Sequence, residues 1–149
     1  MTYFQFEADF VEALRCIPMQ VRYKLDTCGV KLKLIHWNQF GLAERQALVD
    51  RPCENPETAE DYRDYLQSRV VAHTGTPASR LAIDPNPPWH QEQIPDAVVQ
   101  KLEETKQQLT PESWAALTPL QRFALIKLSR PGHENRNFIP ALAEFTAGA

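Results

Sequence analysis

The sequence predicts an all-α fold, built from two similar helical units that are joined by a proline-rich connection. Ten residues in the first half recur 77 positions later, all in one register. Self-similarity at a fixed period indicates a repeated supersecondary unit. Proline and N-cap signals divide both halves into helices, and no segment shows the continuous period-two alternation of a half-buried strand. The recurring positions are Ile17, Pro18, Val21, Lys24, Leu25, Leu32, Trp37, Arg45, Ala47 and Leu48.

We expect both copies to pack as one compact domain over residues 1–149. The copies lie at about residues 17–73 and 94–149, and the connection at about 74–93. A chain of this length buries roughly 70% of its unfolded surface, so it needs neither disulfides nor a structural metal. The prolines of the connection exclude a helix there. Trp89 and the stretch 81–83 could pin it to the surface, so an ordered strap and a mobile linker both stay open.

The first half has its own helix signals. An apolar stripe predicts a helix at about residues 7–16, which ends before Pro18. That proline can open the next helix, whose apolar face runs to Gly29, a natural C-terminal stop. A further apolar stripe predicts a helix at about residues 57–73.

The second half has clearer signals for helix boundaries, and these signals help to interpret the first half. Thr110 followed by proline predicts a helix from residue 111 to about 117, and the Thr118 capping box predicts another that runs to about Ser129. Shifted back by 77 positions, these signals predict helices at about residues 34–40 and 42–50. Trp37 and Trp114 then become equivalent packing residues. A last apolar stripe, near the C-terminus, consists of Phe138, Leu142 and Phe145.

Composition and motifs exclude several function classes. The formal charge of −3 and the pI near 5.8 give no general attraction to nucleic acid or to an anionic membrane. There is no export signal and no apolar run long enough for a membrane span, so we expect a cytoplasmic protein. The sequence has no Gly-rich phosphate loop, no Ser-His-Asp signature and no His-Glu-x-x-His. We therefore expect a protein that is not an enzyme and carries no resident cofactor.

The candidate metal ligands all lie in the first copy, and none is repeated in the second. Sulfur and imidazole ligands suit Zn²⁺ or an iron-sulfur cluster. The spacing contains no Cys-x2-Cys pair, however, and matches no standard site. Cys28 lies on an apolar helix face and is expected to pack in the core, whereas Cys16 and Cys53 are expected to be exposed and reactive. The candidates are Cys16, Cys28, Cys53 and His36.

Charge also separates the copies. The stretch 15–33 holds five basic residues against Asp26, a net charge of +4, whereas the equivalent stretch 92–110 has a net charge of −2. Such a run is either a solvated face or a docking patch for an acidic partner or an anionic cofactor. The basic residues are Arg15, Arg22, Lys24, Lys31 and Lys33.

The N-terminal third contains a long and distinctive pattern, in segments 4–10, 14–19, 21–26 and 28–32 together with Trp37 and 51–53. In this pattern the chain resembles the nitrate reductase-associated protein family of cyanobacteria. The resemblance implies an accessory protein needed for an active assimilatory nitrate reductase, an enzyme with a molybdenum cofactor and an iron-sulfur cluster. The family supplies no catalytic residues to carry over.

We therefore expect a non-enzymatic accessory or maturation factor, which acts as a chaperone for nitrate reductase by binding the apoenzyme or by assisting cofactor insertion. The five basic residues would dock an acidic surface or the anionic pyranopterin, and Cys16 and Cys53 would be the participating thiols. One alternative is a metal or iron-sulfur carrier that uses the first-copy cysteines. Another is a helical scaffold or regulatory protein without a cofactor role. Neither nucleic acid nor a membrane is an expected partner.

Overall fold

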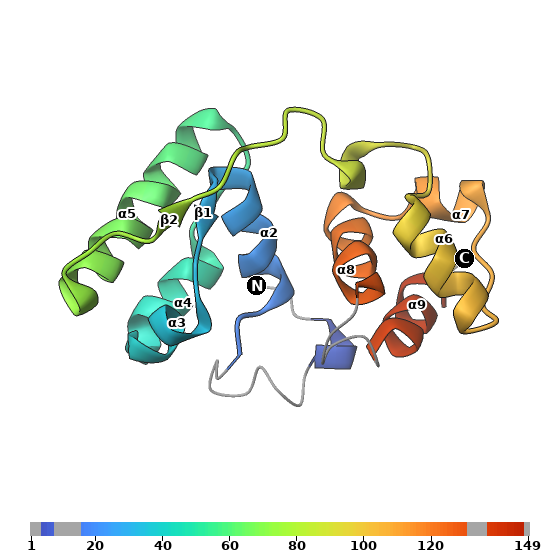
Figure 1. The fold of residues 1–149 in the computed structure, drawn as a ribbon, viewed down its shortest axis with the longest axis horizontal. Helices are drawn as coiled ribbons and strands as arrows, with labels where there is room; N and C mark the ends of the chain where they lie inside the picture. Colours follow the sequence, from blue (N-terminus) through green and yellow to red (C-terminus); the bar gives the residue numbers. More distant parts are fainter. Residues whose placement is uncertain (1–3, 8–15, 131–136, 148–149) are drawn as a thin grey trace. The chain divides into compact units, whose positions relative to one another are not determined.

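The computed structural model describes residues 4–7, 16–130 and 137–147 (Figure 1). These residues are mostly helical, which confirms the predicted predominance of helix, and they include one short antiparallel strand pair. Their contacts divide the chain into two compact units. The first unit comprises Glu7 and residues 16–83, and the second comprises residues 4–6 with the described residues from 84 onward.

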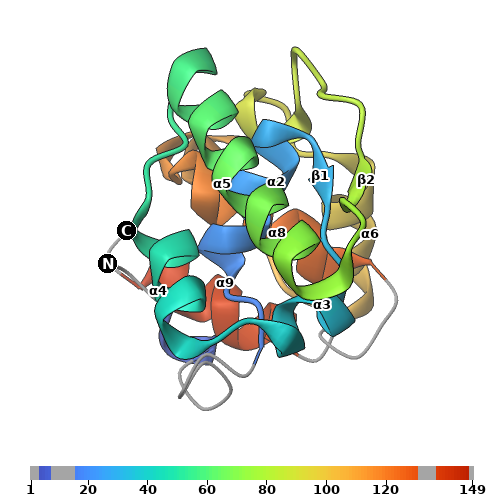
Figure 2. The same cartoon turned by 90° about the vertical axis from the view of Figure 1, so that its left-hand side faces the viewer.

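The first unit packs three helices against α5, its longest helix. Figure 2 shows α5 lying across α2, with the strands β1 and β2 side by side. In the strand pair, Val30 is opposite Arg80 and Lys31 is opposite Ser79. Two-residue strands are too short to show an alternating pattern, which is why the sequence did not reveal them. The elements are α2 (Met19–Cys28), β1 (Val30–Lys31), α3 (Leu34–Gln39), α4 (Leu42–Asp50), α5 (Pro56–Thr74) and β2 (Ser79–Arg80).

Apolar residues at helical spacing form the core of the first unit. Val21 and Leu25 of α2, Trp37 of α3 and Leu48 of α4 are all buried. Tyr62 of α5 is buried beside them and donates its hydroxyl hydrogen to the carbonyl of Leu48 at 2.7 Å. Burial of such large side chains stabilises each helix, since short isolated helices are marginal in water.

The start of α2 is stabilised by a buried carboxylate. Pro18 precedes the helix and contributes no side-chain cap. Glu7, which is almost fully buried, accepts the backbone N–H of Met19 at 3.2 Å. A negative charge is favourable at a helix N-terminus, where backbone donors are unpaired. Glu7 itself lies in a short 3-10 helix, η1 (Gln5–Glu7), and most of the helix predicted at 7–16 falls outside the described residues.

The second unit is arranged around α8. This helix packs against α6, α9 and the short helix η3. Phe4 and Phe6 close the unit by packing on Phe145 of α9, with ring centroids 4.7 and 6.1 Å away, respectively. The N–H of Phe6 also donates to Glu144 at 3.0 Å. The elements are η3 (Pro88–His90), α6 (Asp96–Glu104), α7 (Pro111–Ala116), α8 (Pro119–Ser129) and α9 (Phe138–Thr146).

Three pairs of helices begin at positions 77 residues apart, namely α2 with α6, α3 with α7 and α4 with α8. The bounds of α3, α4, α7 and α8 agree with the sequence prediction to within one residue, because Thr110 and Thr118 cap α7 and α8 as expected. The helix exits also correspond. Gly29 after α2 has φ +77°, and its counterpart Lys106 after α6 has φ +56°.

Each end of the connection, which we call the strap, contacts its own unit. In the first unit, the side-chain amide of Gln67 binds both backbone groups of Ala78, and Leu81 donates its N–H to Gly29 at 2.8 Å. In the second unit, the ring of Trp89 packs edge-on against Phe123 at 5.0 Å. The division between the units falls within the strap, after residue 83.

Candidate functional site

Two of the predicted docking residues are engaged inside the first unit. Arg22 donates from Nε to the carbonyl of Ile17 at 3.1 Å. The ammonium of Lys24 donates to the carbonyls of Val49 and Arg51 at 2.6 and 2.7 Å. These carbonyls lie at the end of α4, where the helix itself offers no partner. Lys24 therefore links α4 to α2. Arg15, which was also predicted to dock, lies outside the described residues.

Lys31 and Lys33 remain exposed, and two large apolar side chains follow them directly. Leu34 is 55% exposed and Ile35 is 62% exposed, at the first turn of α3. We call these four residues the α3 patch. The equivalent positions of the second unit hold Gln108, Thr110, Pro111 and Glu112, which carry neither a positive charge nor a large aliphatic side chain. The α3 patch thus places two adjacent exposed apolar side chains beside two exposed basic ones.

His36 stabilises the start of α3. The backbone N–H of Lys33, at the N-cap position, donates to His36 Nδ1 at 3.1 Å. Burial and the charge of Lys33 lower the pKa of His36, so the neutral ring that can accept this hydrogen bond is favoured. His36 thus has a capping role in the segment that carries the α3 patch, where the sequence had offered it as a metal ligand.

One of the three cysteines is half-buried and the other two are buried. Cys16 is half-buried and Cys28 is fully buried, as predicted for a core thiol. The prediction that Cys53 is exposed was wrong, because this side chain turns inward from the loop after α4 and is only 4% exposed. Its sulfur lies 3.6 Å from the carbonyl of Lys24. In the described part of the chain, no three His, Cys, Asp or Glu side chains converge as metal ligands.

Cys28 and Cys53 interact with each other at the end of α2. Interaction with the Cys53 side chain raises the pKa of Cys28, and burial raises it further. The same interaction and the nearby Lys24 ammonium lower the pKa of Cys53, although burial opposes the shift. No sequence signal indicated this pair, since the two residues are far apart in the chain and lie in different elements.

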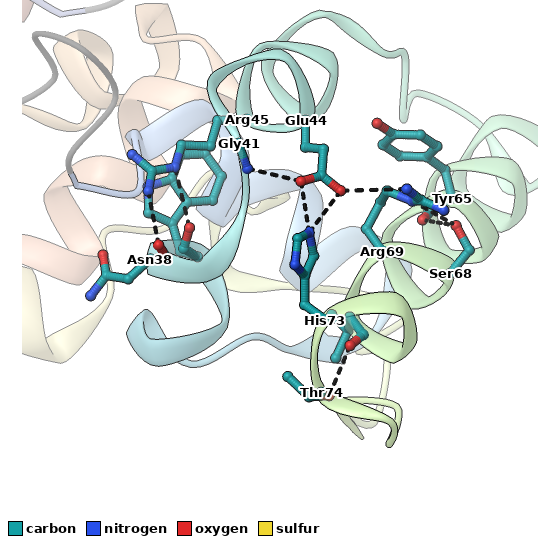
Figure 3. Close-up of polar contacts among 11 residues, drawn as sticks. Asn38, Gly41, Glu44, Arg45, Tyr65, Ser68, Arg69, His73 and Thr74 are labelled. Atoms are coloured by element: carbon teal, nitrogen blue, oxygen red, sulfur yellow. Dashed lines mark hydrogen bonds and ion pairs between the residues drawn. The ribbon is translucent and has the colours of Figure 1, made fainter.

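A second polar cluster joins α4 to α5 (Figure 3). Glu44 accepts the N–H of Gly41 at 2.8 Å, so it caps α4, and it also reaches across to α5. There His73 Nε2 lies 2.8 Å from one carboxylate oxygen, and Arg69 lies 3.5 Å from the other. Burial favours the neutral carboxyl, but these three partners outweigh it and lower the pKa of Glu44. The only sequence signal was that Glu44 corresponds to Gln121, the capping glutamine of the second copy.

Comparison with known proteins places the whole chain in one family. No similar protein was found among curated proteins, and no solved structure matches. None of the described helices is long and apolar enough to cross a membrane. A family model described as conserved nitrate reductase-associated protein matches residues 3–145, which include both units and the strap, whereas the resemblance in the sequence lay mainly in the first third. The chain therefore belongs to the conserved nitrate reductase-associated protein family.

Proposed function

We propose that this protein is a non-enzymatic accessory factor that binds the apoenzyme of nitrate reductase in the cytoplasm and assists its maturation. The family match supports an association with that enzyme. A binding role also agrees with the α3 patch, in which contiguous apolar side chains are accessible to a partner. Interfaces of this kind combine an apolar centre with a charged rim.

The α3 patch is the observation that carries the proposal. Lys31 and Lys33 supply positive charge, and Leu34 and Ile35 supply apolar area that no neighbour covers fully. The partner surface that fits is an acidic region around an apolar recess on the reductase. This docking surface is smaller than the five-residue basic run, because Arg22 and Lys24 hydrogen-bond within the first unit.

The sequence of the second unit suggests a variant that tests the apolar part of the α3 patch. Leu34 and Ile35 correspond to Pro111 and Glu112, so the double substitution Leu34→Pro, Ile35→Glu gives α3 the start of α7. Proline is tolerated at the first helical position, and Lys33 already has the extended backbone that must precede a proline. We expect an unchanged helical content and at least a tenfold weaker association with purified apo-reductase. Unchanged affinity would contradict the proposed surface.

Charge reversal tests the basic part of the α3 patch. The double variant Lys31→Glu, Lys33→Glu should bind the reductase more weakly, and its residual binding should depend less on salt concentration. The matched control reverses two positive charges of the second unit, in Lys106→Glu, Arg130→Glu. The control should bind as the unchanged protein does, whereas equal losses in both variants would mean that net charge alone drives association.

Capture from cells distinguishes maturation from other binding roles. The tagged protein is used to capture the reductase from cells that can or cannot synthesise the molybdenum cofactor. A maturation factor should retain mainly the cofactor-free enzyme. Equal capture of both forms, without any effect on activation, would instead favour a scaffold or regulatory protein. A carrier of metal or clusters would be recognised by near-stoichiometric iron, zinc or molybdenum after anaerobic purification.

We infer further that the two units descend from one duplicated helical unit. The shared register of three helix pairs supports this inference, as does a repeated contact between an arginine and a tryptophan. In each unit the arginine lies eight residues after the tryptophan and donates to its carbonyl, from Arg45 to Trp37 and from Arg122 to Trp114. The α3 patch and the buried cysteines are then features that only one copy has.

A further inference from the structure

We propose that Cys28 and Cys53 form a peroxide-responsive dithiol, which closes to an intramolecular disulfide inside the first unit. This inference does not depend on binding to nitrate reductase. It rests on the placement of two sulfurs that come from different elements, one from the last turn of α2 and one from the loop between α4 and α5.

The end of α2 holds both sulfurs in the same place. The sulfur of Cys28 lies 3.7 Å from the carbonyl of Leu25, and that of Cys53 lies 3.6 Å from the carbonyl of Lys24. These two carbonyls belong to consecutive residues. Each cysteine is also the largest influence on the pKa of the other, as expected for neighbouring thiols. A disulfide requires the two sulfurs to approach to about 2.05 Å.

The surroundings favour Cys53 as the sulfur that reacts first. Lys24 places its ammonium between the carbonyls of Val49 and Arg51, just before Cys53 in the chain. This charge and the Cys28 thiol stabilise a thiolate at Cys53, which is the nucleophilic form. Cys28 keeps its proton more firmly, and it is therefore suited to act second, as the resolving thiol.

A small oxidant needs only a limited opening to reach Cys53. The sulfur is covered by its own loop, and the loop residues on either side, at 51, 52, 54 and 55, are all exposed. Hydrogen peroxide is scarcely larger than water. Short exposed loops are also the parts of a fold that open locally at the least cost in free energy.

The chemistry balances with one molecule of hydrogen peroxide. The Cys53 thiolate attacks one peroxide oxygen, the O–O bond breaks, and the departing hydroxide takes up the proton that Cys53 released, which forms water. Cys53 is now a sulfenic acid. The Cys28 sulfur attacks the sulfur of Cys53, the S–O bond breaks, and hydroxide leaves with the Cys28 proton as a second water. Two thiols and one peroxide thus become one disulfide and two waters.

The disulfide would tie the end of α2 to the loop that precedes α5. A cross-link over 25 positions restricts the unfolded chain more than the folded one. The oxidised protein should therefore unfold at a temperature higher by about 5 °C or more. Adding a dithiol reductant should return the original unfolding temperature.

The direct test uses the unchanged full-length protein. The reduced protein is treated with equimolar hydrogen peroxide, its remaining thiols are alkylated under denaturing conditions, and its peptides are mapped by mass spectrometry. We expect a Cys28–Cys53 linked peptide that lacks two hydrogen atoms, with Cys16 alkylated. The proposal is overturned if Cys28 and Cys53 both stay alkylatable, if either one pairs with Cys16, or if Cys53 proceeds to sulfinic acid while Cys28 remains a thiol.

Three variants examine the roles of individual residues. Cys16→Ser should form the linked peptide at the same rate as the unchanged protein. Cys28→Ser should trap Cys53 as a sulfenic acid that a dimedone reagent labels. Lys24→Gln should slow the loss of thiols several-fold, because the charge that supports the Cys53 thiolate is gone. An unchanged rate in Lys24→Gln would show that this ammonium does not activate Cys53.

Discussion

The guanidinium of Arg45 lies 5.7 Å from the centre of the Trp37 ring and hydrogen-bonds to the two residues at the end of α3. Its Nε donates to the carbonyl of Trp37 and its Nη2 to that of Asn38, both at 3.2 Å. Arg122 has the same relation to Trp114 in the second unit, with a ring distance of 5.8 Å. Each arginine therefore links a short helix to the longer helix that follows it.

Substitution of these arginines should destabilise both units to a similar degree. Arg45→Met and Arg122→Met each remove hydrogen bonds to helix-end carbonyls and a cation–π contact, at a cost of about 1 to 2 kcal/mol. Lysine should restore only part of the loss, because one ammonium cannot reproduce the planar fork of a guanidinium. Urea unfolding followed by circular dichroism measures the effect. Losses within about 0.3 kcal/mol of zero would show that the contact contributes little.

Gly29→Ala should be far more damaging than Gly75→Ala. Both glycines have a positive φ, +77° and +80°, so a side chain costs about 1 kcal/mol or more at either position. A Cβ at Gly29 would also lie 2.8 Å from the backbone oxygen of Leu81, whereas one at Gly75 meets nothing within 4 Å. We expect a loss of about 3 kcal/mol for Gly29→Ala. Equal losses in thermal unfolding would contradict this steric explanation.

Lys106→Gly should stabilise the protein. Lys106 has φ +56° directly after α6, and its N–H donates to Glu103 while that of Gln107 donates to Leu102, the hydrogen bonds of a Schellman motif. Glycine adopts this conformation without the penalty of a Cβ, so we expect a gain of about 0.5 to 1 kcal/mol. Lys106→Ala is the control, since it shortens the side chain but keeps the Cβ. Equal stabilisation by both variants would exclude relief of backbone strain.

Glu44→Gln should remove a pH-dependent contribution to the free energy of unfolding. Because the folded state lowers the pKa of Glu44, its contribution is fully present above the ordinary glutamate pKa of about 4.3 and is lost as the pH falls through the lower folded value. Glutamine can still accept the N–H of Gly41, as Gln121 does for Thr118. The difference in unfolding free energy between the unchanged protein and Glu44→Gln should therefore shrink at acidic pH. A difference that is constant with pH would count against this role for the charge.

Helix positions were predictable because their signals are local. A threonine that precedes a proline caps the helix that follows, and the accepted N–H belongs to a residue three positions later, as with Thr110 and Ser113. The second copy, with clearer caps, then located α3 and α4 in the first. The strand pair escaped detection since Val30 and Lys31 meet residues about 50 positions away, and a two-residue strand has no period.

The candidate site was less predictable because it depends on tertiary contacts. Lys24 belongs to a basic run, but its flexible stem carries the ammonium to carbonyls more than 20 positions away. Cys53 was expected at the surface because it follows an Arg-Pro turn, and only the packed unit shows where its side chain points. By contrast, Leu34 and Ile35 differ from Pro111 and Glu112, so comparison of the copies already contained a signal for the α3 patch.

The packing of Phe4 and Phe6 on Phe145 has a consequence for biosynthesis. Phe6 leaves the ribosome well before Glu144, which accepts its N–H and follows 138 positions later. Phe145, on which Phe4 and Phe6 pack, comes next in the chain. The first unit can assemble its helices while the nascent chain grows, whereas the second cannot complete its packing before α9 has been synthesised. Folding of the second unit thus depends on the synthesis of α9.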